Sequence, residues 1–305
     1  MRRALLSWTL VFALLAAGFA ASVLALNADL YSAGGFVRSY LEALQRGDAE
    51  SALATDGVEG ASPLVTDATV GGFDGIRLVS DVADGDTHTV RVGYTIADTE
   101  QISEFSVERT GTRLGLFPTW RFAVSPIATL AVTVDHDSRV SINGTDAAAG
   151  SHALLVPSAV TLTHDTLYLE ALPVSVALTE VNSTVEAAVA VAPKPAFTEA
   201  ATAALKTFLD ECATQQVLKP TGCPFGTSVT NRAGSPQWSI VDYPTAALEP
   251  NGAAWQTTGA ATAHVTVQVT SLFDGTVSTL DDDVPFTATY RVTIGPGDSL
   301  SVLLG

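Results

Sequence analysis

The chain has 305 residues, 47% of them hydrophobic, and its 32 acidic against 15 basic side chains give a formal net charge of −17. A surface this acidic repels nucleic acid, so we exclude nucleic-acid binding and interpret the charge as keeping an exported body soluble, with a dedicated cation-binding surface as the alternative. The length exceeds what one hydrophobic core needs, so we expect two or three domains.

The first feature along the chain is an apolar run, residues 4–26, that contains no charged side chain. At about 1.5 Å per residue a helix of this length reaches about 34 Å, enough to cross a hydrocarbon core of roughly 30 Å. Arg2 and Arg3 precede the run, and basic residues favour the cytoplasmic side. The sequence therefore predicts a single-pass anchor over residues 1–27 in the cell membrane. The N-terminus would then be cytoplasmic and the rest of the chain would lie outside. Membrane lipid would contact residues 4–26.

A cleaved secretory signal is the alternative interpretation of the same run. Val23, Leu24 and Ala25 offer the small-residue spacing that a signal peptidase cuts, and the body would then be secreted. The run is longer than the usual apolar region of about 7–15 residues in such signals, which favours an uncleaved anchor.

Residues 28–125 are predicted to form a first α+β domain. Apolar residues recur at helical spacing from Val37 to Leu44, Gly47 can end that helix, and Asp48 can begin a second, shorter one. Segments with strand-like alternation follow at residues 76–80, 88–96, 102–108 and 119–124.

The segment FVRSYLEALQRGDAESAL, followed by these strands, resembles the start of nuclear transport factor 2-like (cystatin-like α+β) domains in single-pass bacterial envelope proteins. The resemblance covers mainly residues 33–124, and its most telling part is a helix ending in Gly-Asp before a second helix. It implies a sheet curled over a helix around a conical pocket, in which active relatives place Asp or His. His88 alternates with Val90 and Val92, so it can be a surface or packed residue or a pocket acid or base, with no partner assigned.

Residues 126–192 are predicted to form a small all-β module, because short strands alternate with turn signals such as Asn143-Gly144. Asp135-His136-Asp137 is expected to be a turn, with metal binding as the alternative, because adjacent side chains on a strand face opposite ways. His152 and His164 have no third ligand nearby in sequence and are expected to be surface residues.

Residues 193–305 are predicted to form a second α+β domain after the proline-rich segment 191–195. Its helix places Ala201, Leu205, Phe208 and Cys212 on one face, with Thr198 as the expected N-cap. Expected strands follow at residues 237–243, 261–273, 284–294 and 299–304.

The two cysteines, Cys212 and Cys223, lie in this last domain and are predicted to form a disulfide. A catalytic or metal-binding thiol is the alternative, although no histidine or third cysteine lies nearby in sequence. The acidic cluster at residues 281–283 lacks the spacing of a calcium loop, so we expect a solvated hairpin rim, and His264 is expected on the solvent side of its strand. Trp120 and Trp238 are expected in cores.

The sequence contains none of the common catalytic or nucleotide-binding motifs, and no catalytic, cofactor-binding or metal-binding residue is assigned. The predicted fold is α+β: a transmembrane helix, then two helix-plus-antiparallel-sheet domains flanking a small β module. The predicted function is a non-enzymatic extracytoplasmic envelope protein that contacts another protein or the cell-wall polymer. The alternative is a small-ligand site or acid–base enzyme in a pocket of either α+β domain.

Overall fold

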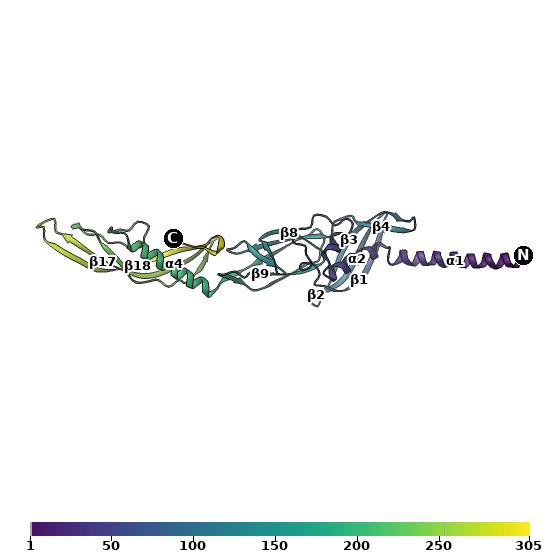
Figure 1. The fold of residues 1–305 in the computed structure, drawn as a ribbon, viewed down its shortest axis with the longest axis horizontal. Coiled ribbons are helices and arrows are strands. Elements are labelled where there is room, and N and C mark those ends of the chain that lie inside the picture. Colours follow the sequence, from purple (N-terminus) through teal and green to yellow (C-terminus); the bar gives the residue numbers. More distant parts are fainter. Residues whose placement is uncertain (1, 253) are drawn as a thin grey trace. The chain divides into compact units, whose positions relative to one another are not determined.

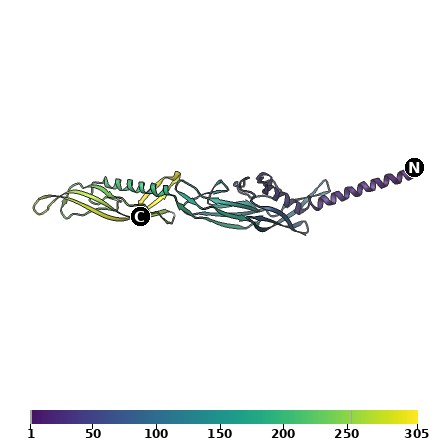
Figure 2. The ribbon, with the colours of Figure 1, turned by 90° about the horizontal axis from the view of Figure 1, so that it is seen from below.

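The structure is a computed structural model that describes residues 2–252 and 254–305. Met1 and the side chains of residues 2–11, the first part of the predicted anchor with Trp8, lie outside this description. The fold is mixed α+β with strands predominating (Figures 1 and 2). Contacts divide the chain into two units. Unit 1 comprises residues 1–134, 138–163 and 173–189, and unit 2 comprises residues 135–137, 164–172 and 190–305.

Helix α1 (Arg2–Ala28) opens unit 1. Five large apolar side chains along its described part are more than 60% exposed: Phe12, Leu14, Leu15, Phe19 and Leu24. Between residues 12 and 305, leaving out residue 253, no single helix is long and apolar enough to cross a membrane. Phe12–Ala28 and Ala33–Gln45, bent by 56°, pass the same criterion only as a pair.

The predicted helix pair is present as α2 (Ala33–Gln45) and α3 (Ala49–Leu53). Ser32 begins α2 by accepting a hydrogen bond from the Gly35 amide at 2.9 Å. Gly47 has a φ of +72°, as expected for the residue that ends the first helix. Asp48 caps α3 by accepting from the Ser51 amide at 3.0 Å, and its hydrogen bonds with Ser51 lower the pKa of its carboxyl group.

A four-stranded antiparallel sheet follows α3 in the order β1-β2-β3-β4. Its strands are β1 (Asp74–Asp84), β2 (Thr87–Ile96), β3 (Thr99–Arg113) and β4 (Phe117–Phe122). The first three contain the predicted segments 76–80, 88–96 and 102–108, whereas β4 ends two residues before the predicted end at residue 124. Alternate residues on one face are buried, among them Val90, Phe105 and the expected core residue Trp120. The buried ring of Tyr40 on α2 packs edge-on against Phe105 and Phe122, with ring centroids 6.3 and 5.0 Å away.

Seven further strands complete unit 1 in two sheets, ordered β12-β5-β8 and β11-β9-β6-β7. The strands are β5 (Ile127–Val134), β6 (Arg139–Ile142), β7 (Thr145–Ala148), β8 (Gly150–Leu155), β9 (Ser158–Thr163), β11 (Val174–Leu178) and β12 (Thr184–Val189). The expected turn at Asn143-Gly144 joins β6 to β7, and both residues have positive φ, +48° and +81°.

The Tyr40 hydroxyl connects α2 to this second group of strands. It donates to the Val156 carbonyl oxygen at 2.9 Å, and burial raises the pKa of the hydroxyl well above its ordinary value. Tyr40→Phe removes this buried hydrogen bond, so we expect the free energy of unfolding of unit 1 to fall by about 1–2 kcal/mol. Tyr31→Phe, at a half-buried ring of the same unit, should change it by less than about 0.5 kcal/mol in the same urea titration.

Unit 2 contains helix α4 (Pro195–Ala213) beside a six-stranded sheet built on two long paired strands. The sheet strands are β14 (Arg232–Ala233), β15 (Gln237–Asp242), β16 (Glu249–Asn251), β17 (Ala254–Thr270), β18 (Val277–Ile294) and β19 (Leu300–Leu304). Short strands β10 (Leu169–Ala171) and β13 (Val191–Pro193) pair separately, and a 3-10 turn, η1 (Pro296–Asp298), precedes β19. The expected N-cap at Thr198 is wrong. The helix begins at Pro195 after Lys194, because proline fits the first helical turn.

The buried face of α4 carries Phe197, Ala201, Leu205, Leu209 and Cys212. Trp238 is buried as expected and packs against Phe225, with ring centroids 5.0 Å apart. Cys212 and Cys223 form the predicted disulfide, with a sulfur–sulfur distance of 2.05 Å. It joins the end of α4 to the loop that leads to the sheet.

Candidate functional site

A cleft in unit 1 brings together side chains that can donate, accept and carry charge. We call it the His88 cleft, and it encloses about 250 Å³. Its lining comes from the end of α1, the start of α2 and strands β1 to β4: Asn27, Tyr31, Ser32, Ala33, Asp81, Gly85, Asp86, His88, Arg109, Pro118 and Trp120. This volume lies below the roughly 300–1,000 Å³ of pockets for drug-sized ligands, so the cleft suits a small molecule.

His88 and Asp81 form a close pair in this cleft. The register of the β1–β2 hairpin sets Ala83 opposite His88, so Asp81, two residues earlier, is the diagonal neighbour of His88 on the same face. His88 Nδ1 lies 2.6 Å from Asp81 Oδ1, and each side chain is 23% exposed. The other carboxylate oxygen of Asp81 accepts from the Gly34 amide at 3.3 Å in the first turn of α2, where the helix dipole favours a negative charge.

Trp120 fixes the other side of the imidazole. Its indole Nε1 donates to the Tyr31 carbonyl oxygen at 2.9 Å, and its ring meets His88 edge-on with centroids 4.7 Å apart. Asp81 can only accept at this contact when ionised, so His88 Nδ1 is the donor, and in the neutral imidazole the lone pair is then on Nε2. The imidazole can therefore accept a proton or a hydrogen bond from a small polar ligand, while Arg109 supplies a cation at the same cleft.

The sequence pointed to His88 and left two roles open. The structure places it in a cleft with Asp81 as its partner, but Asp81, Trp120 and Arg109 were not identified from the sequence. A signal for Asp81 was present. A two-residue turn at Gly85-Asp86 sets the hairpin register, and that register alone brings Asp81 beside His88.

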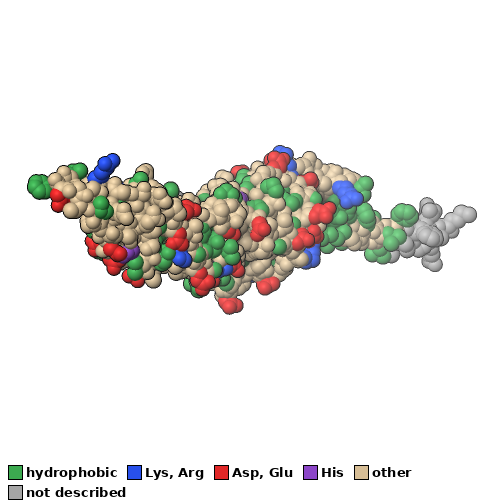
Figure 3. Space-filling model, turned by 60° about the vertical axis from the view of Figure 1, so that its left-hand side comes forward, with side chains coloured by type: hydrophobic (Ala, Val, Ile, Leu, Met, Phe, Trp, Pro, Cys, Tyr) green, Lys and Arg blue, Asp and Glu red, His purple; other side chains and the backbone are tan. Residues whose placement is uncertain are grey.

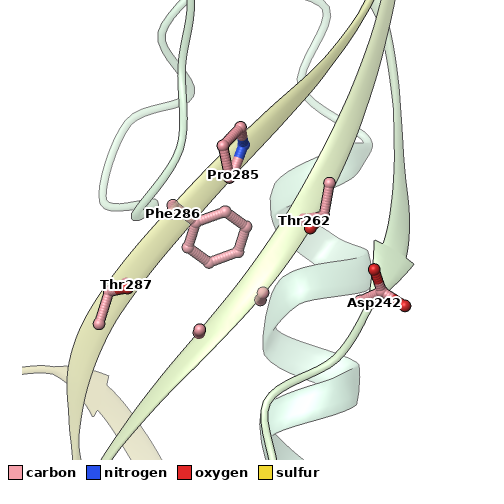
Figure 4. Close-up of a pocket in the computed structure, with 7 residues that line it drawn as sticks. Asp242, Thr262, Pro285, Phe286 and Thr287 are labelled. Atoms are coloured by element: carbon pink, nitrogen blue, oxygen red, sulfur yellow. The ribbon is translucent and has the colours of Figure 1, made fainter.

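Two other hollows have fewer ionisable side chains in their linings. One, of about 410 Å³ in unit 2, lies on β17 and β18 (Figure 4) and is lined by Asp242, Ala260, Ala261, Thr262, Pro285, Phe286 and Thr287. Figure 4 shows Asp242 on the far side of β17 from Phe286, and it is the only ionisable residue of that lining. The other, of about 430 Å³, contains the exposed ion pair between Arg91 and Glu104.

The acidic cluster of unit 2 surrounds His264 on the surface of the long hairpin. Asp283 Oδ1 lies 2.8 Å from His264 Nδ1, and Asp281 Oδ1 lies 3.0 Å from Nε2. The hydrogen bond to Asp283, together with the nearby charge of Asp281, raises the pKa of His264. His264 lies on the face opposite the buried Val265, as predicted. The cluster is solvent-exposed as expected, but it lies within β18 opposite residues 264–266 of β17 rather than at the end of the hairpin.

We expect Asp283→Asn to lower the pKa of His264 in a proton NMR titration, because it removes the strongest partner of the charged ring. A raised folded pKa stabilises unit 2 fully below the unfolded value of about 6.5, and this contribution is lost as pH rises through the folded pKa. Asp282→Asn is the matched control, since Asp282 is paired with Val265 in the strand register rather than with His264. Equal shifts in the two variants would contradict the assignment.

The remaining histidines differ in burial. His136 lies in a turn, as expected, with φ of +62°, and its ring is 4.9 Å from that of Trp255. His152 donates to the Ala148 carbonyl oxygen at 2.8 Å at the surface. The surface assignment of His164 is wrong: its side chain is 1% exposed and its Nε2 lies 3.6 Å from the Asp137 carboxylate.

Among residues 2–252 and 254–305, no group of three or more His, Cys, Asp or Glu side chains is arranged to hold a metal ion. Comparison of the chain with family models, with curated proteins and with solved structures gave no match.

Proposed function

We propose that this chain is a single-pass protein of the bacterial cell envelope, anchored by residues 4–26 with its two units outside the cell membrane. The observation that carries the proposal is α1, a helix whose predicted anchor has no charge and whose described large apolar side chains are exposed. Water penalises such surface by roughly 25 cal/mol per Å², whereas lipid tails accept it. Arg2 and Arg3 favour a cytoplasmic N-terminus.

The span in this proposal is α1 alone. The second member of the bent pair, α2, places Val37, Leu41 and Leu44 in the core of unit 1, where they are fully buried. A helix whose apolar face is already covered by its own sheet has no such surface left for lipid.

We also propose a domain layout for the exported body. We propose a nuclear transport factor 2-like domain over residues 33–124, supported by a helix pair followed by an antiparallel sheet packed on Tyr40. A β module over residues 126–192 and a second α+β domain over residues 193–305 complete the layout. These boundaries are predictions from sequence, and the observed contacts assign residues 135–137 and 164–172 to unit 2.

The proposed role of the exported body is non-enzymatic contact with another envelope protein or with the cell-wall polymer. Figure 3 shows acidic side chains spread over its visible face and few basic ones, so partners or polymers with positive groups are favoured.

Alkaline extraction of membranes, followed by mass measurement of the retained protein, tests the anchor. We expect the full-length chain, with residues 4–26 intact, to stay in the membrane pellet. Replacing Leu15 and Phe19 with lysine should release it, because each charge at a helix centre costs roughly 2.5–3.5 kcal/mol on insertion scales. A soluble product lacking the run would instead support the cleaved signal and secretion. Crosslinking in intact cells should recover a defined neighbour, and recovery of none would count against the contact role.

The His88–Asp81 pair favours a second candidate function, binding of or acid–base chemistry on a small polar ligand in the His88 cleft. Titration of isotope-labelled protein with small carboxylates, amino acids and sugars should shift the His88 and Trp120 resonances before those of the surface residue His152. His88→Ala should abolish the remaining shifts. Absence of any shift at millimolar probe would reject this candidate function and would leave the proposed anchoring by α1 unaffected.

A further inference from the structure

The turn between β3 and β4 exposes apolar side chains at the end of unit 1 where α1 leaves it. Leu114 at the turn is 83% exposed, and Leu116, which follows it, is 41% exposed. Figures 1 and 2 both show this hairpin end beside the last turns of α1. A soluble domain gains nothing from a leucine held in water at a turn.

Three contacts fix the direction in which the hairpin runs along α1. Trp120 Nε1 donates to the Tyr31 carbonyl oxygen at 2.9 Å, and the Phe117 ring lies 4.5 Å from the Tyr31 ring. Asn27 Nδ2 then donates to the Leu116 carbonyl oxygen at 2.9 Å. Moving from Trp120 toward the turn therefore moves toward the N-terminus of α1.

Leu114 lies further than Asn27 in this direction, toward the apolar run of α1, which ends at residue 26. A strand advances about 3.3 Å per residue, so a position two residues beyond Leu116 reaches about 3–7 Å further toward the run. Interfacial elements bury their apolar side chains about 5–10 Å into the boundary between headgroups and acyl chains. If α1 spans a bilayer, Leu114 lies at that depth.

The backbone of the turn indicates that leucine is not there for local stability. The Leu116 amide donates to the Arg113 carbonyl oxygen at 3.1 Å, and the two central residues, Leu114 and Gly115, have φ of +55° and +67°. Such a turn favours Asn or Gly at its first central position, and a bulky side chain is unfavourable there. The same chain uses Asn143-Gly144 for its equivalent turn between β6 and β7.

The charge of the hairpin end also differs from that of the rest of the chain. Residues 109–118 contain Arg109 and Arg113 and no acidic residue, in a protein of net charge −17. Arg113 is exposed next to Leu114. Figure 3 shows basic side chains beside hydrophobic ones at this end of unit 1. A basic residue flanking an apolar tip suits the headgroup region of a membrane.

We propose that the β3–β4 turn is a second membrane contact: Leu114 and Leu116 insert into the outer-leaflet interface of the bilayer that α1 spans, and Arg113 binds the lipid headgroups. This inference rests on the proposed anchoring by α1. Two points of attachment hold unit 1 at a fixed tilt to the membrane, with the mouth of the His88 cleft near the headgroups, because that cleft shares Asn27 and Tyr31 with the hairpin contacts.

The test uses the full chain in vesicles whose lipids carry nitroxide quenchers at known depths. Both native cysteines are in the disulfide, so an introduced cysteine is the only free thiol and takes a single fluorescent label. Labels at Leu114→Cys and at the neighbouring Thr112→Cys should be quenched severalfold, most strongly by shallow quenchers. Ala97→Cys is the matched control, because Ala97 is an exposed turn residue with positive φ at the opposite end of the same sheet, and its label should not be quenched.

A label at Ser22→Cys in α1 separates the two proposals. Quenching at Ser22 without quenching at positions 112 and 114 would overturn the hairpin contact and leave the anchor standing. Loss of quenching at all three positions would reject the anchor itself. Labels at 112 and 114 that are shielded from water but not quenched by lipid would also overturn the proposal, because protein rather than lipid would then cover the turn. With Thr112 labelled, Leu114→Asn should reduce quenching at least twofold while quenching at Ser22 stays unchanged.

Discussion

Phe197→Ala should lower the free energy of unfolding of unit 2 by about 3–5 kcal/mol, the largest effect that we expect from a single substitution in this chain. The Phe197 side chain is fully buried at the start of α4. Its ring meets Trp255 edge-on at 5.6 Å and lies 5.4 Å from Tyr168. Truncation removes this apolar contact and leaves a cavity between the helix and the sheet, because packed surroundings collapse only in part.

The same substitution at Phe273 is the matched control. Phe273 lies at the turn between β17 and β18 and is 99% exposed, so Phe273→Ala should change stability by less than about 0.5 kcal/mol. Hydrogen exchange in increasing urea, followed on peptides from unit 2, measures both variants. Similar losses in the two would show that α4 does not depend on Phe197 for its packing.

Removing the disulfide by the double substitution Cys212→Ala and Cys223→Ala should destabilise unit 2 by about 2–3 kcal/mol. The bond closes a loop with a sequence separation of 11, and opening it returns conformational freedom to the unfolded chain. Cys212 is also buried in a cluster with Trp238 and Phe225, and alanine keeps that environment apolar.

Reduction provides the control for the disulfide prediction. A thiol reductant should lower the stability of the native chain by nearly the same amount, and it should leave the double variant unaffected. An equal stability with and without the bond, measured by the urea midpoint, would mean that Gln215 alone holds the loop. Its side chain already accepts from the Thr221 amide at 2.8 Å and donates to the Thr221 carbonyl at 3.2 Å.

Local signals in the sequence predicted much of the secondary structure because they act over a few residues. Each of these features depends on residues that are close in sequence: the helix spacing at Val37 and Leu44, the left-handed Gly47, the Asp48 cap and the Asn143-Gly144 turn. The disulfide followed from the presence of two cysteines only. Where two local signals competed, as at the start of α4, the proline at position 195 prevailed over Thr198.

Long-range placement was not accessible to the same reasoning. His164 was expected at the surface because no third ligand lies near it in sequence, but residues 164–172 pack within unit 2 and bury it near Asp137. The candidate site shows the same limit. His88 stood out as a residue type, whereas its partner Asp81 depends on the register of a hairpin, and Trp120 reaches it from β4, about thirty residues later in sequence.

If α1 anchors the chain with both units outside the cell membrane, as we propose, protease added to sealed cells can reach both units. Immunodetection of epitopes at the two ends of the chain follows the digestion. We expect the C-terminal epitope to be lost from intact cells while a short N-terminal fragment stays protected. A C-terminal epitope that survives in intact cells and is degraded only after lysis would contradict this topology.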